Sequence, residues 1–346
     1  MFSTLRMILN DWQRLYRHNG GIRALFRSIV GTIRLTRGDF TPAEPSLPGV
    51  DVITFSVVPK MTALWTNWIR TAVDMRPLRV YIGDCSGTLN KYLPGDDVVR
   101  LVPLLNYHHG EKLDLFVKHL CRTDYVIVTD DDIFWLDTTP WQWAFEQLEK
   151  DPNVAVASIL PFKITSDTLQ GKVHLPMGSC FVIRRSAFVK ENLSFKVDFS
   201  PVKEGKWLYD TGSKAQIQLL ERGYKIVYAP QEIQDRLEAF EGMSSWMLKI
   251  QKQDGNILDN IVVDSSVRPA KAYRTILVAK GLASLISSYP WGHSDPHLVS
   301  LPLLEKAEAV CRQALSSEAA DTIQNEIESQ IARLKITSAA SYQENT

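Results

Sequence analysis

Short apolar runs that end in turn-forming residues recur along most of the chain, and stretches with helical spacing lie between them. Apolar, β-branched runs of this kind are typical of strands that are buried on both faces of a sheet. Apolar side chains at intervals of three and four residues are typical of helices that cover such a sheet. The predicted strands are 52–57, 78–82, 98–102, 125–129, 154–159, 178–185 and 225–228, and the predicted helices are 61–75, 111–121, one beginning near 138, 210–222, 270–288 and one or two within 301–334.

The order of these elements predicts an α/β fold. Strands that alternate with helices build a mostly parallel sheet whose connecting helices cover both of its faces. We therefore expect a Rossmann-like, mostly parallel mixed sheet over 51–235 and a helical C-terminal extension over 236–334. A basic helical arm over 1–40, a Pro-rich linker over 41–50 and a disordered polar tail over 335–346 complete the predicted organisation.

The overall composition narrows the class of protein. The chain has 346 residues, of which 45% are hydrophobic, and its formal net charge is zero, so nothing global points to nucleic acid. Its four cysteines lie far apart and form no C-x-x-C pair, which favours a reducing compartment over a disulfide framework or a zinc site. No apolar run is long enough to cross a membrane, and the charged start does not fit a signal peptide. We therefore expect a cytoplasmic protein.

The arm over residues 1–40 departs from this neutral balance. It carries seven arginines against two acids, a net charge of +5, and apolar side chains that include Trp12 and Phe26 recur between them at helical spacing. Basic amphipathic helices of this kind favour anionic membrane surfaces, which would place the protein peripherally on the inner face of the membrane. The alternative is a helical pair that packs on the domain and shows its arginines to water.

Three acids, Asp130, Asp131 and Asp132, directly follow the predicted strand over 125–129. Open α/β sheets bind ligands at the carboxyl ends of their strands, so these side chains fall where a site is expected. Like charges this close repel by roughly 1–4 kcal/mol per pair, and a divalent cation with oxygen ligands, Mn²⁺ or Mg²⁺, would relieve the repulsion. Alternation along an extended chain puts Asp130 and Asp132 on one face and Asp131 on the other. A solvated, inert acidic turn is the alternative.

Other polar residues accompany this D-x-D element in a fixed order. A first strand ends near Ser56, a second ends in Asp84, a helix carries Lys112, a strand is entered through Gly178, and a late helix is opened by an acid, Asp210. Over about residues 50–235, this ordered set resembles the family 2 glycosyltransferases, which have the GT-A fold. The resemblance implies a metal-dependent enzyme, using Mn²⁺ or Mg²⁺, that moves a sugar from a UDP- or GDP-sugar to a hydroxyl of a carbohydrate or lipid-linked acceptor. It also implies inversion at the sugar and a place in surface polysaccharide or glycolipid synthesis.

The resemblance further implies roles for individual residues. The general base would be Asp210, although Tyr209 stands before it where the family commonly has Glu. The third metal ligand, often His in related enzymes, is not evident: Gln234 lies near the expected place and His293 and His297 come much later. The remaining roles would fall to Ser56, Val58, Asp84, Lys112, Asp114, Asp130 and Asp131 for the nucleotide, to Asp130 and Asp132 for the metal, and to Gly178 and Ser179 for the acceptor and donor sugar.

Other classes fit the residues less well. A haloacid-dehalogenase-type phosphatase also has a D-x-D strand end, but it wants a small β-branched residue where this chain has Phe134. A nucleotidyltransferase would want a Gly-rich, Arg-containing loop after the first strand, and a calcium loop would need Gly where Trp135 stands. A non-catalytic, membrane-associated sugar-binding or scaffold protein on a decayed transferase fold stays open. Purely structural roles are also possible for single residues. Asp84 could cap its own turn, and Lys112 and Asp114 could be exposed helix residues. The tryptophans at 135, 141 and 143 could pack in the core.

Overall fold

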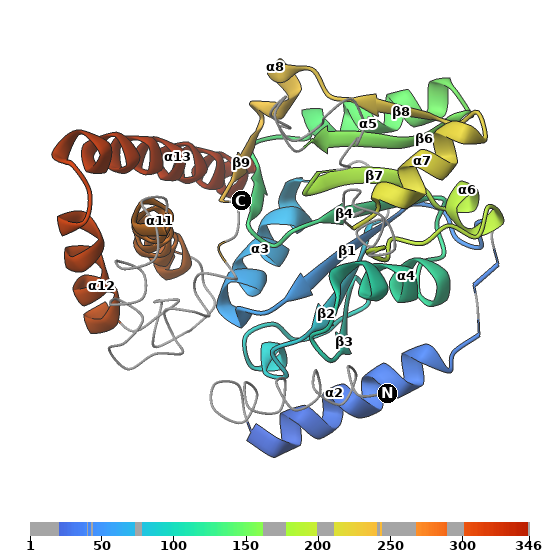
Figure 1. Ribbon diagram of the computed structural model, residues 1–346, viewed down its shortest axis with the longest axis horizontal. Helices are drawn as coiled ribbons and strands as arrows, with labels where there is room; N and C mark the ends of the chain where they lie inside the picture. The colour runs from blue at the N-terminus through green and yellow to red at the C-terminus, as the bar shows by residue number, and fades with distance from the viewer. Residues whose placement is uncertain are drawn as a thin grey trace.

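A seven-stranded mixed sheet lies at the centre of the structure, a computed structural model (Figure 1). Strand β7 runs antiparallel to both of its neighbours, β4 and β6, and the remaining neighbours are parallel. The strands are β1 (Val50–Ser56), β2 (Leu78–Asp84), β3 (Val99–Pro103), β4 (Tyr125–Thr129), β6 (Val154–Leu160), β7 (Cys180–Arg184) and β8 (Lys225–Tyr228). The structure describes residues 21–39, 41–42, 44–72, 78–161, 178–198, 211–240, 243, 268–288 and 301–344.

The strand order, β3-β2-β1-β4-β7-β6-β8, contains a reversal that fixes where a ligand can bind. From β1 the chain moves outward to β2 and β3, and it then returns to place β4 on the other side of β1. The two strands pair in parallel with Val52 opposite Ile127, so their carboxyl ends lie at the same edge of the sheet. In open α/β sheets, the crevice above such a switch point is the usual ligand site. The three acids that follow β4 therefore lie at that crevice.

Helices cover both faces of the sheet, which confirms the predicted fold class. Val52 and Ile53 are consecutive in β1 but belong to two different apolar clusters, one on each face, as the strand alternation requires. Helices α3 (Pro59–Ala72) and α5 (Thr139–Lys150) contribute to the first cluster; α4 (His109–His119), α6 (Arg185–Lys190) and α7 (Ser213–Glu221) contribute to the second. Short elements that the sequence pattern did not predict are η1 (Leu89–Lys91) and α8 (Gln231–Gln234).

The helical C-terminal extension consists of α11 (Arg268–Ser288), α12 (Leu301–Gln313) and α13 (Ser317–Glu344), which stand beside the sheet (Figure 1). Buried leucines of all three helices belong to the same apolar cluster as α3, so the extension shares a continuous core with the sheet. The predicted disorder over 335–346 is wrong for most of that range, because α13 continues to Glu344. These residues are polar, but Ala, Gln and Glu are strong helix formers and prolong a helix already anchored by its buried residues.

The N-terminal part of the described chain is tied to the edge of the sheet. Helix α2 (Gly21–Thr36) lies next to edge strand β3 (Figure 1), and its Ala24, Leu25 and Leu35 are buried. The Pro-rich segment that follows is held by hydrogen bonds, in which the buried Arg185 donates to the carbonyl oxygen of Thr41 at 2.8 Å. Residues 1–20, half of the predicted arm, lie outside the described residues. None of the described helices is long and apolar enough to span a membrane.

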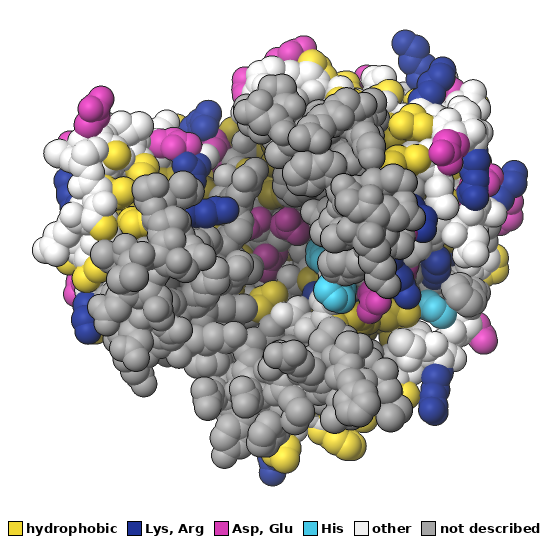
Figure 2. Space-filling model, viewed as in Figure 1, with side chains coloured by type: hydrophobic (Ala, Val, Ile, Leu, Met, Phe, Trp, Pro, Cys, Tyr) yellow, Lys and Arg dark blue, Asp and Glu magenta, His cyan; other side chains and the backbone are white. Residues whose placement is uncertain are grey.

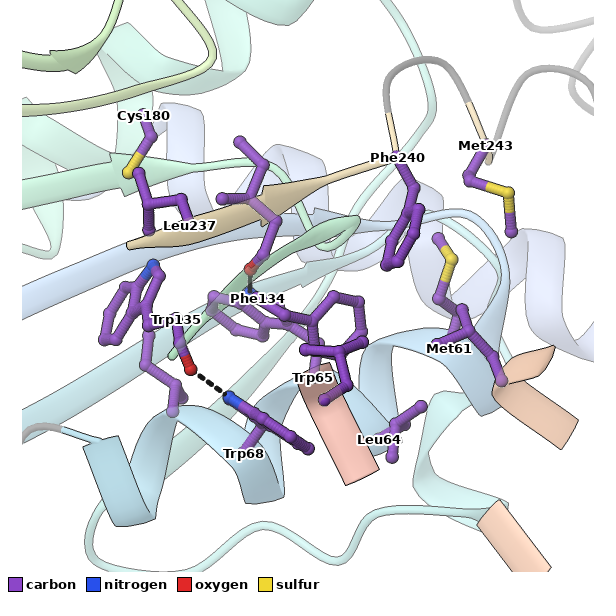
Figure 3. Close-up of a cluster of buried hydrophobic side chains, with 14 of the residues drawn as sticks. Met61, Leu64, Trp65, Trp68, Phe134, Trp135, Cys180, Leu237, Phe240 and Met243 are labelled. Atoms are coloured by element: carbon purple, nitrogen blue, oxygen red, sulfur yellow. Dashed lines mark hydrogen bonds between the residues drawn. The ribbon is translucent and has the colours of Figure 1, made fainter. Parts of the chain in front are cut away.

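A small second sheet forms directly after the three acids, where the sequence predicted none. Strand β5 (Ile133–Trp135) pairs antiparallel with β9 (Leu237–Ala239), and two tryptophans of α3 hold it from below. Trp65 Nε1 donates to the carbonyl of Ile133 at 3.0 Å and Trp68 Nε1 to that of Trp135 at 2.6 Å (Figure 3). Because β4 and β5 are both fixed by buried contacts, the turn between them has little freedom. Trp135 and Trp141 are buried, so their predicted role in core packing is confirmed.

Candidate active site

The turn that carries the three acids lies between β4 and β5. Asp130 is half-buried, whereas Asp131 and Asp132 are only 3% and 5% exposed. Figure 2 shows acidic side chains gathered in a hollow near the centre of one face of the molecule. A solvated acidic turn would have shown these carboxylates to bulk water. Their burial rules out that alternative and makes the turn a place where negative charge is concentrated.

Asp132 lies in an unfavourable electrostatic setting. Burial raises the pKa of its carboxyl well above the usual range, and the neighbouring charges of Asp130 and Asp131 raise it further. Partial compensation comes from Met243, whose backbone N–H donates to Asp132 Oδ2 at 3.1 Å. The backbone N–H of Phe240 donates to the carbonyl oxygen of Asp132 at 2.9 Å, so two backbone groups that follow β9 contact this residue. Figure 3 shows the side chains of Phe240 and Met243 in the adjoining apolar cluster. Positive charge beside this carboxylate would be strongly favoured.

Asp131 makes an inward-facing contact, on the side away from the expected metal position. Its Oδ2 accepts a hydrogen bond from Thr62 Oγ1 at 2.5 Å, and that hydroxyl lies 2.7 Å from Ser56 Oγ. When the Thr62 hydroxyl donates its hydrogen bond to the Asp131 carboxylate, the Ser56 hydroxyl can donate to Thr62 Oγ1, and the three side chains form a continuous series of hydrogen bonds. These hydrogen bonds join the end of β1, the start of α3 and the acid turn. The nucleotide roles predicted for Ser56 and Asp131 remain predictions, since in this structure both polar groups are engaged within the protein.

We expect Thr62→Val to lower the free energy of unfolding by about 1–3 kcal/mol, because this isosteric change leaves Ser56 and Asp131 without their shared partner in a buried place. The matched control is Thr66→Val, one turn later on α3, where the buried hydroxyl only bonds the backbone carbonyl of Thr62. Urea denaturation of the two variants tests this. Equal, small losses would show that the chain of hydroxyls does not hold the turn.

Asp84 caps the loop that follows β2. Its Oδ1 accepts from Ser86 Oγ at 2.6 Å and from the backbone N–H groups of Ser86 and Gly87 at 3.1 and 2.8 Å. Its Oδ2 accepts from Leu89 N at 3.3 Å. Burial raises the pKa of the carboxyl, and these hydrogen bonds counter part of that effect. The turn-capping alternative is therefore confirmed. A contact with the base or ribose of a donor remains a prediction.

Lys112 is buried, 3% exposed, and has no acidic partner among the described residues. Its Nζ donates to Asn106 Oδ1 at 3.0 Å and lies 3.7 Å from Cys85 Sγ, while the ammonium sits 4.7 Å from the centre of the Phe55 ring. A buried cation held only by neutral groups favours an electron-rich ligand atom nearby. This placement, at the carboxyl ends of β1 and β2, agrees with the predicted nucleotide role and not with an exposed helix residue.

Asp114 makes hydrogen bonds within the protein that the sequence did not predict. It is buried and accepts from Ser194 Oγ at 2.5 Å and from the backbone N–H of Phe195 at 2.8 Å, so it fixes the segment after α6 to helix α4. Burial raises the pKa of its carboxyl despite these two donors. The exposed-helix alternative is wrong for this residue too, and its role at the nucleotide stays a prediction.

Gly178 and Ser179 enter β7 beside the acid turn. Asp130 N donates to the carbonyl of Ser179 at 3.2 Å, so the structure brings these predicted sugar-site residues next to Asp130, a predicted metal ligand. Gly178 has φ +84°, and a Cβ there would lie 1.9 Å from the carbonyl oxygen of Leu160, so only glycine fits. Ser179 Oγ is shielded from solvent and has no hydrogen-bond partner in the structure. An orphaned hydroxyl at this position suits a ligand oxygen.

Several predicted residues cannot be placed. Asp210, the expected base, lies outside the described residues, as do His293 and His297. Gln234 is described, but its side-chain amide donates to the carbonyl of Ala229 at 2.7 Å. Within the described part of the chain, no group of three His, Cys, Asp or Glu side chains converges in a way that could hold a metal ion. The third ligand that the resemblance implies is therefore not identified.

Two polar residues with contacts in the candidate site were not predicted from the sequence. Thr62 links β1 to the acid turn, and Asn106 holds the buried lysine in place. Thr62 could have been noticed as a polar side chain at helical spacing with the apolar residues of α3, close after the strand end. Asn106 precedes a helix in a loop, where polar residues are common, so it carries no distinguishing signal.

No family model matches the sequence, and no curated protein matches it. Among solved structures, the chain is similar to the mannosyltransferase PcManGT from Pyrobaculum calidifontis in complex with GDP-Man and Mn²⁺, at 16% identity over 99% of both chains with a TM-score of 0.41. It is also similar to S. aureus TarS, at 12% identity over 86% of this chain and 92% of that one with a TM-score of 0.38. The galactosyltransferase LgtC in complex with donor and acceptor sugar analogs follows, at 11% identity over 52% and 73% with a TM-score of 0.34. Glycosyltransferases are thus among the similar structures, while identities this low leave the activity of this chain to be inferred from its site.

Proposed function

We propose that the chain is a metal-dependent glycosyltransferase that moves a sugar from a nucleotide-sugar donor to a hydroxyl acceptor. The observation that carries the proposal is the buried acid turn at the switch point of the sheet, where Asp132 lacks adequate positive charge beside Asp130 and Asp131. Carboxylate oxygens suit Mn²⁺ or Mg²⁺, and the half-buried Asp130 and buried Asp132 are the residues that would hold the ion. When bound, such an ion stabilises negative charge on a diphosphate leaving group.

The chain's own residues supply the rest of the proposed reaction. Lys112, the loop capped by Asp84 and the end of β1 form the side on which we place the nucleotide, with UDP- or GDP-sugar as the donor class. Gly178 and Ser179 bring backbone and an unpartnered hydroxyl to Asp130, where we place the transferred sugar. The acceptor hydroxyl needs a base, which is worth roughly 10²–10⁴ in rate, and the family resemblance assigns that role to Asp210 with inversion at the sugar.

The basic arm over residues 1–40 supports a proposal for the acceptor class and for where the enzyme lies in the cell. We propose a carbohydrate or lipid-linked acceptor in surface polysaccharide or glycolipid synthesis. The basic and apolar residues of the arm support a cytoplasmic enzyme held peripherally on the inner face of the membrane.

Thermal denaturation in the presence of UDP or GDP, with and without Mn²⁺, tests the proposal. We expect a rise in Tm of a few °C only when nucleotide and metal are both present, since a ligand at about 100 times its Kd adds about 2.7 kcal/mol to the folded state. Asp132→Asn should remove the metal-dependent part of the rise. A protein that responds to neither nucleotide, with or without metal, would be a scaffold on a transferase fold and not an enzyme of this class.

A further inference from the structure

A second cavity lies between helix α2 and edge strand β3, and none of its lining residues belongs to the candidate active site. Its volume is about 950 Å³. Four arginines line it, Arg27, Arg34, Arg100 and Arg122, against one acid, Asp39. Several positive charges around one concave surface focus a field that attracts anions.

The arginines of this cavity differ from most others on the surface. Most exposed arginines elsewhere in the described chain pair with acids, as Arg236 does with Asp137 at 3.2 Å. Arg34 and Arg100 are exposed, and neither side chain has an ion pair or hydrogen bond within the described part of the chain. A guanidinium group offers paired N–H donors that match the oxygens of a phosphate. Arg27 donates to the carbonyl oxygen of Gly87, whereas Arg34 and Arg100 have no acceptor among the described residues and keep their donors for a phosphate group.

An apolar stripe runs along the same helix. Ile22, Phe26 and Ile33 are 64%, 67% and 44% exposed, although residues of this kind are usually buried. At 3.6 residues per turn, the three fall within about 40° of one another around the helix axis, and Arg27 and Arg34 follow about 110° further round. Phe26 also lines the cavity, so the stripe and the basic row adjoin. Apolar and basic side chains lie together at the lower rim of Figure 2, where Figure 1 places α2.

We propose that α2 lies in the headgroup layer of an anionic phospholipid membrane, with a lipid phosphate in the cavity contacted by Arg34 and Arg100. The stripe of Ile22, Phe26 and Ile33 then faces the acyl chains, as in interfacial helices whose apolar face enters the boundary of the bilayer. A soluble phosphate would use the arginines but leave the stripe in water, which is why the membrane is the occupant favoured by both features together. This inference deepens the peripheral membrane location proposed above and does not depend on sugar transfer.

Co-sedimentation of the full chain with vesicles tests the proposal. We expect binding to vesicles of phosphatidylcholine mixed with phosphatidylglycerol, much weaker binding to phosphatidylcholine alone, and a decline with added salt. The double variant Arg34→Gln/Arg100→Gln should bind the mixed vesicles about 30-fold more weakly, because each basic group near an anionic surface is worth about 1 kcal/mol. Phe26→Ser should bind about tenfold more weakly, because it removes apolar surface from the stripe.

The matched control is Lys150→Gln/Lys306→Gln, which removes two exposed charges elsewhere and should bind like the unmodified chain. A Tm measurement confirms that each variant is folded, and Phe26→Ser changes a side chain with few contacts to lose. Equal weakening by the control and the arginine variant would overturn the proposal, because net charge alone would then explain binding. A rise in Tm with inorganic phosphate, without vesicle binding, would overturn it in favour of a soluble ligand.

Discussion

Replacing Asp132 with Asn is expected to make the metal-free protein more stable while lowering sugar transfer by about 10²–10³-fold or more. The stability gain follows from the raised pKa of the carboxyl. An acid whose pKa is raised by folding holds its proton more tightly in the folded state, so folding stability falls as pH rises from the unfolded value of 3.8 through the folded one. Because burial and the charges of Asp130 and Asp131 raise the pKa of this carboxyl, its ionised form is unfavourable in the folded state. The amide keeps an acceptor for the N–H of Met243 without that cost.

Urea denaturation in EDTA, at neutral pH and near pH 4, measures this effect. The advantage of Asp132→Asn should be largest at neutral pH and shrink toward pH 4, where the native carboxyl is protonated in the folded state. Asp151→Asn is the matched control, because Asp151 is partly exposed, pairs with Lys225 at 2.6 Å and has a pKa lowered by that pairing. It should give no gain and no loss of transfer. An Asp132→Asn variant that is less stable than the parent without metal, or that keeps full turnover, would remove the case for a metal at this turn.

Asp84→Ala is expected to destabilise the protein by about 2–4 kcal/mol, since four buried donors lose the oxygens that accept them. The control is Asp96→Ala. Asp96 accepts the backbone N–H groups of Val98 and Val99 at 2.8 and 2.6 Å in a loop of the same kind, but that loop is exposed. Water can replace the carboxylate there, so the loss should stay under about 1 kcal/mol. Denaturant titration of both variants compares the same hydrogen-bond pattern in a buried and an exposed setting.

Asp84→Asn separates the turn-capping role of Asp84 from its predicted contact with the nucleotide sugar. The side-chain carbonyl oxygen of Asn can still accept the hydrogen bonds that Asp84 Oδ1 accepts, so most of the loop should keep its structure. Only the hydrogen bond from Leu89 N should be weakened. Nucleotide affinity, measured by calorimetry on this folded variant, then reports on the predicted contact with base or ribose. An unchanged affinity would leave Asp84 as a structural cap alone, and the nucleotide site would have to be built around Lys112.

Local pattern was sufficient for much of the fold. The apolar runs around Ile53, Ile127 and Val156 predicted strands because a side chain buried on both faces of a sheet has to be apolar wherever it points. The acids after β4 were placed at a ligand edge by the same reasoning, since parallel strands end together. The short strands β5 and β9 were not predicted from the sequence. Their pairing depends on contacts with α3 and on a segment about a hundred residues later in the chain, and no local period reports on such contacts.

The sequence by itself determined the α/β architecture, the position of the acid turn and the amphipathic character of the arm, because each depends on periodicity and on neighbours in the chain. Only the tertiary structure decided what those residues contact. It turned Asp131 inward to Thr62 and made Asp84 and Asp114 tethers. Within the described residues, it buried Lys112 without an acidic partner and left Ile22 and Phe26 exposed near Arg34 and Arg100, which have no ion pair there. The physical reason is that burial, and the electrostatic and hydrogen-bonding consequences of burial, are set by segments distant in the chain, which a local pattern cannot encode.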